Sequence, residues 1–163
     1  MLKRKIELEF TEYDDFNELD AAEQHLVNEA RRAVGHAYAP YSEFKVGAAV
    51  LLENGNVIIG SNQENAAYPS GLCAERVALF AAKSQFPDQK IVAVAIATAA
   101  GEVTGEPIAP CGGCRQVFAE YGDQQPSEIV LLLAAGTQRV SRFDDARLLL
   151  PGRFSWKDLK KGR

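Results

Sequence analysis

The sequence predicts an α/β protein with a mixed β-sheet flanked by helices. Segments with the two-residue period of half-buried strands alternate with segments of helical period. Two nearly continuous apolar runs fall late in the chain, at 91–98 and 128–134, as is typical of strands that helices bury on both faces. With 163 residues and 47% hydrophobic composition, the chain is expected to form one domain with a substantial core.

The N-terminal part predicts an edge strand followed by a helix. Apolar and polar residues alternate over 5–13, which indicates an extra strand at the edge of the sheet. Asp20 is the expected N-cap of a helix whose apolar positions recur as far as Ala37, and Pro40 ends it. This helix is expected to lie on the surface of the sheet.

The rest of the chain predicts a hairpin and two helices. Asn54-Gly55 separates the apolar runs 45–52 and 57–60, and Asn-Gly suits the positive φ angles of a type I′ turn. These two strands are therefore expected to pair antiparallel. Helices are expected over 73–84 and 112–121, each followed by one of the two buried strands.

Charge and hydropathy exclude several kinds of partner. Eighteen Lys and Arg against 22 Asp and Glu give a net charge of −4, and no segment concentrates positive charge. Nucleic-acid binding is disfavoured, because affinity for phosphates needs a basic face. Residues 1–5 are basic, but no apolar signal core follows them and no run approaches about 18 apolar residues. We expect a soluble, cytoplasmic protein that binds neither nucleic acid nor membranes.

Three cysteines are the strongest indication of chemistry. An odd number does not suit a disulfide framework, whereas cysteines at short spacing in the cytosol suggest a metal or catalysis. Cys111 and Cys114 would lie one turn apart at a helix N-terminus, where thiolates are favoured. Together with Cys73 they would leave tetrahedral zinc one open position, the arrangement of catalytic sites that hold water.

Two charged residues follow the first cysteine closely. Three thiolates make zinc a weak Lewis acid, so a neighbouring base is needed, and Glu75 is the candidate. Arg76 could donate hydrogen bonds to ligand sulfurs or could be a solvated surface residue, and its spacing favours neither reading.

Two other readings of the cysteines stay open at this point. Cys111 and Cys114 could form a redox pair, although Cys73 and Glu75 would then have no explanation. A closed structural zinc site would need a fourth ligand. Only two histidines are available for it, and both lie in the first predicted helix.

The cysteine motifs match a known signature. Cys-x-Glu followed by Pro-Cys-x-x-Cys occurs in zinc deaminases that act on nucleobases. With its other motifs, the sequence resembles the small homotetrameric zinc-dependent cytidine deaminases from about residue 30 to 159. The segments that carry the resemblance are Tyr38-Ala39-Pro40-Tyr41-Ser42, Phe44-Lys45-Val46-Gly47-Ala48-Ala49, Asn62-Gln63-Glu64-Asn65-Ala66-Ala67-Tyr68, Cys73-Ala74-Glu75-Arg76, Pro110-Cys111-Gly112-Gly113-Cys114-Arg115-Gln116 and Leu149-Leu150-Pro151-Gly152-Arg153-Phe154.

The resemblance implies an architecture and an assembly. The fold would be a cytidine deaminase-like three-layer α/β/α sandwich. Residues 21–163 would form the catalytic domain, and residues 1–20 an extension without counterpart in the compact members. One Zn²⁺ per subunit and a homotetramer with active sites shared between subunits are implied.

The resemblance also implies residue roles at the metal. The zinc ligands would be Cys73, Cys111 and Cys114. Glu75 would be the proton shuttle, and Arg76 would donate hydrogen bonds to the ligand sulfurs.

Further roles are implied at the substrate. Asn62 and Glu64 would bind the ribose 3′-hydroxyl, although as residues at a strand end they read as loop caps. Phe44 would pack on the nucleoside, although an aromatic residue that opens an apolar strand is ordinarily core. Ala74 would contact the pyrimidine through its backbone. Phe154 would reach the base bound by a neighbouring subunit.

The implied reaction is hydrolysis of cytidine and 2′-deoxycytidine to uridine and 2′-deoxyuridine with release of ammonia, as in pyrimidine salvage. One alternative is a deaminase of a related aminopyrimidine nucleoside such as blasticidin S, and another is a non-catalytic zinc module. A nucleic-acid editing deaminase is disfavoured, because it would need a basic groove and usually has histidine in place of Cys73.

Overall fold

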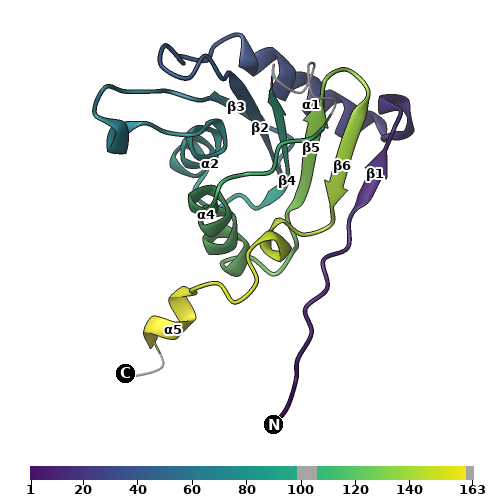
Figure 1. Cartoon of the computed structure of the whole chain (residues 1–163), viewed down its shortest axis with the longest axis vertical. Helices are drawn as coiled ribbons and strands as arrows, with labels where there is room; N and C mark the ends of the chain where they lie inside the picture. The colour runs from purple at the N-terminus through teal and green to yellow at the C-terminus, as the bar shows by residue number, and fades with distance from the viewer. Residues whose placement is uncertain (99–105, 161–163) are drawn as a thin grey trace.

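The protein folds around a six-stranded mixed sheet (Figure 1). The structure is a computed structural model that describes residues 1–98 and 106–160. The strands are β1 (Thr11–Tyr13), β2 (Val46–Leu52), β3 (Val57–Ser61), β4 (Ile91–Thr98), β5 (Val130–Ala135) and β6 (Arg139–Phe143). The α-helices are α1 (Ala21–Val34), α2 (Ala74–Gln85), α4 (Gly112–Asp123) and α5 (Trp156–Lys160). Single 3₁₀ turns form at Phe16–Glu18, Tyr68–Ser70 and Ala146–Leu149.

The strand order is β1-β6-β5-β4-β2-β3, and within it only β4 and β5 are parallel neighbours. The predicted antiparallel hairpin is confirmed, since β2 and β3 pair across the segment 53–56. The expected type I′ turn is wrong, because Gly55 has a φ of 84° but Asn54 does not have a positive φ. The amide of Gly55 donates to the oxygen of Leu52, so one glycine is enough to close this longer loop. The two continuous apolar runs form β4 and β5, which lie at the centre of the sheet. Their backbone groups are therefore paired on both sides, and helices cover both of their faces.

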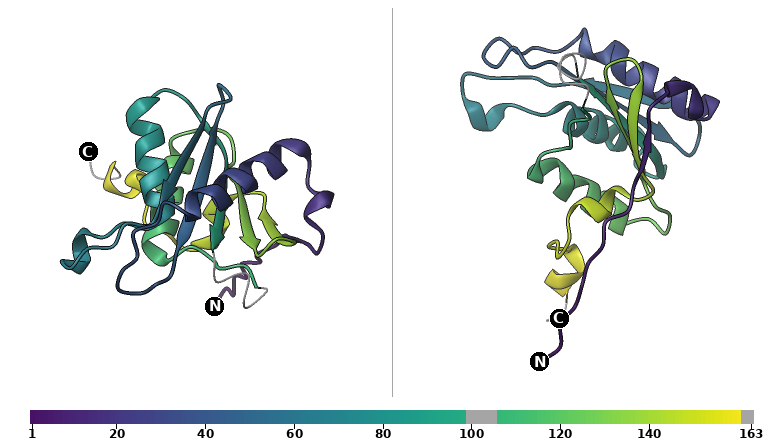
Figure 2. Two further views of the ribbon diagram at one scale, coloured as in Figure 1. Left: turned by 90° about the horizontal axis from the view of Figure 1, so that it is seen from above. Right: turned by 45° about the vertical axis from the view of Figure 1, so that its right-hand side comes forward.

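Helices cover the sheet on both sides, as the views in Figure 2 show. Helix α1 packs on one face, where its Leu26 and Val27 meet Ala49 and Leu132. Helices α2 and α4 cover the other face with a second core. The residues of that core with the largest fully buried side chains include Val50, Leu52, Leu79, Val94, Phe118 and Leu131. The predicted α/β/α sandwich is confirmed.

Two glycines let helices approach the sheet closely. A Cβ at Gly47 would lie 2.1 Å from the backbone oxygen of Ala30 in α1. A Cβ at Gly60 would lie 2.5 Å from the backbone nitrogen of Ala78 in α2. Neither backbone atom can yield to a side chain, so glycine at position 60 determines how closely the first turns of α2 lie against β3.

The N-terminal strand is shorter than predicted. Only Thr11–Tyr13 of the expected segment 5–13 form a strand, because Thr11 pairs with Arg142 and β6 ends one residue later at Phe143. The alternating pattern continues where the ladder has no further partner. The strand β6 was not expected, because Arg and Ser interrupt its few apolar residues.

The first helix also ends earlier than predicted. It ends at Val34, and the chain then makes i to i+3 hydrogen bonds from Gly35 to Arg32, His36 to Ala33 and Ala37 to Val34. Residues 35–37, which continue the helical spacing of apolar positions, therefore form tighter 3₁₀-type turns after the end of the α-helix. None of the helices that the structure describes is long and apolar enough to cross a membrane.

Candidate functional site

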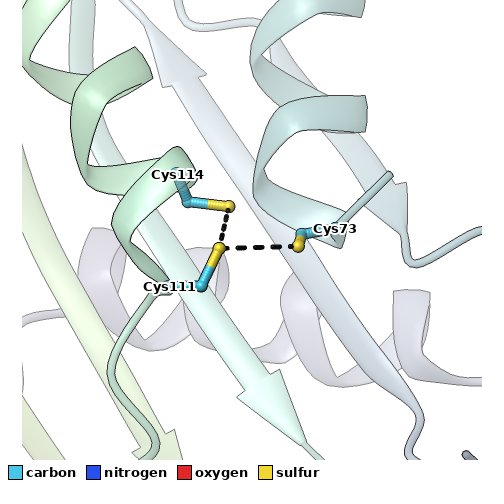
Figure 3. Close-up of side chains that lie close together, drawn as sticks. All are labelled: Cys73, Cys111 and Cys114. Atoms are coloured by element: carbon cyan, nitrogen blue, oxygen red, sulfur yellow. Dashed lines mark hydrogen bonds between the residues drawn. The ribbon is translucent and has the colours of Figure 1, made fainter. Parts of the chain in front are cut away.

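Two helix N-termini bring the three cysteines together (Figure 3). Cys73 is the N-cap of α2, Cys111 is the N-cap of α4, and Cys114 lies in the first turn of α4. The Cys111 Sγ lies 3.8 Å from that of Cys73 and 3.5 Å from that of Cys114. All three sulfurs lie within 4.8 Å of one another. The unpaired N–H groups of both helix ends favour negative charge at this point.

These sulfur separations fit zinc. Tetrahedral Zn–S bonds of about 2.3 Å require sulfurs about 3.8 Å apart. Among the residues that the structure describes, no fourth ligating side chain completes the group. His25 lies on α1 and His36 just after it, both exposed, whereas the cysteines lie on the opposite face of the sheet. The group therefore has the three-ligand form of a catalytic site.

The environment of Cys73 favours its thiolate. Its pKa is lowered to about 5, first by a hydrogen bond from Cys114 and then by Arg76, while partial burial acts in the opposite direction. The Arg76 Nη2 lies 3.7 Å from the Cys73 Sγ and donates to it. Of the two readings of Arg76, the structure shows the contact with the ligand sulfur. The pKa of Cys114 is raised, because it is the donor in its hydrogen bond to Cys73.

Glu75 is a buried carboxyl group beside the cysteines. It lies in the first turn of α2 and is 5% exposed. Burial raises its pKa, and the negative charge of Cys73 adds to the effect. A carboxyl group with a raised pKa can hold a proton and release it again during a reaction, which is the behaviour required of a proton shuttle.

A cavity of about 410 Å³ opens in front of these groups, within the size range of small-molecule sites. Cys73, Glu75 and Cys111 form one part of its wall. The remaining lining residues are Ser42, Phe44, Val46, Asn62, Glu64, Ile96, Thr98, Ile108 and Ala109. A cavity with several apolar lining residues and a few polar groups suits a small, partly polar molecule.

Asn62 and Glu64 line this cavity and also hold the loop that frames it. The Asn62 Oδ1 accepts a hydrogen bond of 2.9 Å from the Val46 amide, and its Nδ2 donates one of 2.8 Å to the Phe44 oxygen. Glu64 accepts hydrogen bonds from the amides of Tyr41 and Ser42, at 2.9 and 3.2 Å. The loop-cap reading is therefore correct. Both side chains still have unused hydrogen-bonding capacity for a ligand.

The other predicted substrate residues lie in different environments. Phe44 lines the cavity and is 36% exposed, so it is not a core residue. Ala74 is fully buried at the start of α2, next to the cysteine. Phe154 is 59% exposed and lines neither this cavity nor the one beside it in its own chain.

Sequence reasoning gave no role to six of the lining residues: Ser42, Val46, Ile96, Thr98, Ile108 and Ala109. Two of them had a usable signal. Ile96 and Thr98 are two residues apart at the carboxyl end of β4, so they face the same side of the sheet at the edge where α/β proteins place ligands. Ile108 and Ala109 come to the wall through the loop before Cys111, which has no periodic pattern.

The fold and the site define an enzyme of the metal-dependent α/β class, with a three-cysteine site and a buried carboxyl group on one cavity wall. The family model described as the cytidine and deoxycytidylate deaminase zinc-binding region matches residues 20–145. The chain belongs to this family. It is accordingly a zinc-binding hydrolytic deaminase, and the fit of the three sulfurs to zinc agrees with this.

Individual relatives support the assignment. The chain is 41% identical to a cytidine deaminase of Halalkalibacterium halodurans over 136 residues, 83% of this chain and 96% of the relative. It is 38% identical to that of Sporosarcina psychrophila, over 82% of this chain and 92% of the relative. Among solved structures, cytidine deaminase from Burkholderia pseudomallei matches with a TM-score of 0.67 and 41% identity over 80% of this chain and 97% of its own. Cytidine deaminase from Mycobacterium tuberculosis matches with a TM-score of 0.65 and 34% identity, over 83% of this chain and 98% of its own.

Proposed function

We propose that the protein catalyses the hydrolysis of cytidine and 2′-deoxycytidine to uridine and 2′-deoxyuridine with release of ammonia, a reaction of pyrimidine salvage in the cytoplasm. The observation that carries the proposal is the position of Glu75 and the cysteines on one wall of a nucleoside-sized cavity. The relatives named as cytidine deaminases support the choice of substrate. Residues 21–163 would be the catalytic domain and residues 1–20 an extension.

Cys73, Cys111 and Cys114 would hold the zinc ion. When bound, zinc supplies Lewis-acid activation of the attacking water. Arg76 donates a hydrogen bond to the Cys73 sulfur, which reduces the excess negative charge of three thiolates.

Glu75 would move the protons of the reaction. It would accept one proton from the water that attacks C4 of the pyrimidine and deliver it to N3. It would then take the second proton from the hydroxyl group now on C4 and deliver it to the amine, which leaves as ammonia. Its burial suits this role, because a raised pKa makes its carboxylate a stronger base and brings the group closer to the pH at which it can both accept and release a proton. Attack converts C4 from planar to tetrahedral, so hydrated-pyrimidine analogues are expected to bind far more tightly than cytidine.

The remaining cavity residues would position the nucleoside. Asn62 and Glu64 would bind the ribose 3′-hydroxyl with their unused hydrogen-bonding capacity, and their contacts with residues 41–46 keep that end of the cavity in place. Phe44 would pack against the nucleoside. The backbone at Ala74 would contact the pyrimidine from the start of α2.

A homotetramer with shared active sites forms part of the proposal. The exposed ring of Phe154 would complete the site of a neighbouring subunit. A second cavity of about 430 Å³ adjoins the first and shares Ser42, Asn62, Glu64 and Cys73 with it. Tyr41 and Tyr68, which line it, are 52% and 77% exposed. Large exposed aromatic residues beside an open site are typical of a surface that a partner covers.

The activity is tested by following the ultraviolet absorbance of cytidine with the zinc-loaded protein. Conversion is expected without chelator, loss of conversion with it, and recovery when zinc is returned. A substrate panel scored by ammonia release includes 2′-deoxycytidine and blasticidin S. Turnover of blasticidin S without turnover of cytidine would assign the alternative substrate. A zinc K-edge spectrum with four protein ligands would support the non-catalytic module.

Sharing of sites is tested by subunit complementation. Glu75→Gln and Phe154→Ala chains are each expected to be weakly active alone. After unfolding and refolding together, a subunit with intact Glu75 can lie beside a neighbour with intact Phe154, so part of the activity should return. No gain over the separate chains would contradict the shared site, and light scattering gives the number of subunits.

A further inference from the structure

The N-terminal arm, residues 2–10, carries a strand pattern that pairs with no strand among residues 1–98 and 106–160. It extends away from the sheet beyond the end of β6 (Figure 1), and its Phe10 stacks on Phe143 with ring centroids 4.8 Å apart. No backbone hydrogen bond joins residues 2–8 to any part of the chain that the structure describes. Ile6 is 70% and Leu8 46% exposed. An extended segment with these properties is suited to pair with another strand.

The two faces of the arm differ in chemistry. One face is mostly apolar and carries Leu2, Arg4, Ile6, Leu8 and Phe10. The other face is charged, with its basic residues first and its acidic residues last: Lys3, Lys5, Glu7 and Glu9. Lys5 and Glu7 already form an ion pair within one chain, as expected for residues on the same side of an extended segment. A charge pattern that reverses along the segment is complementary to its own antiparallel copy.

We propose that the arms of two copies of this chain pair as antiparallel strands about a two-fold axis at Ile6. On the charged face, Lys5 would oppose Glu7 and Lys3 would oppose Glu9 of the other copy. On the apolar face, Ile6 would meet Ile6 and Leu2 would meet Phe10. The Ile6 pair lies on the axis and each of the other pairs occurs twice, so the contact is self-complementary and closes at two copies.

The charge pattern selects this register over its neighbours. A shift of the axis to Lys5 would place Lys5 against Lys5, and a shift to Glu7 would place Glu7 against Glu7. Like charges directly opposite each other destabilise a strand pair, whereas opposite charges stabilise it. Turning one arm by 180° about its own axis would exchange its two faces. The charged side chains of one arm would then lie on the same face of the strand pair as the apolar side chains of the other, which gives neither ion pairs nor apolar contacts.

The contact is tested by cysteine cross-linking in the zinc-loaded full-length protein. Opposed residues in an antiparallel pair have Cα atoms about 4.5–5.5 Å apart, within the range for a disulfide. Ile6→Cys is therefore expected to form a covalent dimer when diamide is added as oxidant. Leu8→Cys is the matched control, because its two copies would lie about 13 Å apart along the strands.

The expected result is at least about ten-fold more covalent dimer for Ile6→Cys than for Leu8→Cys on a non-reducing gel. Equal cross-linking of the two variants would show a merely flexible tail and would overturn the proposal. Absence of cross-linking from both would overturn it as well. The readout does not depend on the proposed catalytic function or on the assembly of the domain cores.

Charge reversal tests the register. In the Ile6→Cys background, Lys3→Glu with Lys5→Glu is expected to reduce the covalent dimer several-fold, and Glu7→Lys with Glu9→Lys to do the same. The four changes together restore opposite charges at every pair and should restore the dimer. Failure of the four-fold variant to recover would overturn the register. Because the arm lies outside the sheet, circular dichroism and zinc content should stay unchanged in all variants.

Discussion

Gln116 donates a hydrogen bond of 2.9 Å to the backbone oxygen of Phe154. The helix that carries two of the cysteines therefore also holds the C-terminal segment. Arg115, which precedes Gln116, donates hydrogen bonds to the backbone oxygens of Pro110 and Leu149, at 2.8 and 3.0 Å. Two consecutive side chains thus connect the cysteine loop to the segment whose aromatic ring is proposed to serve a neighbouring subunit.

We predict that Gln116→Ala raises the KM for cytidine by about five-fold, from loss of a hydrogen bond worth about 1 kcal/mol. kcat should change less, because the cysteines and Glu75 keep their places. Steady-state kinetics checks this. The matched control is Gln124→Ala, whose side chain contacts Glu120 at the exposed end of the same helix. Equal KM values for the two variants would contradict a positioning role for Gln116.

Glu75→Gln should lower kcat by about 10²–10⁴-fold, because the amide keeps the shape of the side chain but cannot carry the protons. Zinc content should stay at one ion per subunit, because Glu75 is not one of the three cysteines that would hold the ion. Kinetics and metal analysis on the same preparation separate the two effects. Glu29→Gln, on the opposite side of the sheet, is the control and should keep wild-type activity. A Glu75→Gln enzyme with full activity would exclude the proposed shuttle.

Gly60→Ala should destabilise the protein by about 1–3 kcal/mol, because the new Cβ would lie 2.5 Å from a backbone atom of α2. Activity per folded molecule should also fall, because α2 must move and would carry its N-cap Cys73 and its first-turn residue Glu75 with it. Gly35→Ala is the control, with a nearest contact of 3.5 Å and a φ of −63°. Urea unfolding and kinetics measure both effects, and equal midpoints for the two variants would refute the close approach.

Asp123 connects the end of α4 to the C-terminal segment and should give stability that depends on pH. Its carboxylate lies 2.8 Å from Arg153 and 3.0 Å from the hydroxyl of Ser155, and the hydrogen bond from Arg153 is the main reason why its pKa is lowered. A lowered pKa in the folded state gives stability that is present above the ordinary value near 3.8 and lost as the pH falls through the folded value.

Asp123→Asn should therefore lower the free energy of unfolding by about 2 kcal/mol at both pH 7 and pH 5. The difference from wild type should narrow below about pH 4, where the native carboxylate also becomes protonated. Urea midpoints of the zinc-free proteins across this range check the prediction without interference from metal loss. A difference that stays constant down to pH 2 would show that the charge is not responsible.

Much of the fold could be predicted from local patterns. The Asn54-Gly55 turn, the two apolar runs that became β4 and β5, and the N-cap at Asp20 each depend on a few neighbouring residues. The strand β6 was missed, because its Arg and Ser interrupt the apolar pattern. The strand expected over 5–13 was too long, because its alternating pattern extends further than the strand that it pairs with. Its pattern is real, but the partner strand ends at Phe143.

For the site, the sequence by itself determined the chemistry of the metal end. Cys111 and Cys114 are one helical turn apart, and both that spacing and the neighbouring Glu75 can be read from the chain. Only the tertiary structure decided which groups share the cavity, because α2 and α4 reach it from separate parts of the chain and Ile96, Thr98 and Ile108 join them from a strand and a loop. The tertiary structure likewise left the arm at residues 2–10 without a partner strand in the part of the chain that it describes. Spacing along a helix is a local property, whereas the neighbours of a cavity or a strand depend on packing between distant segments.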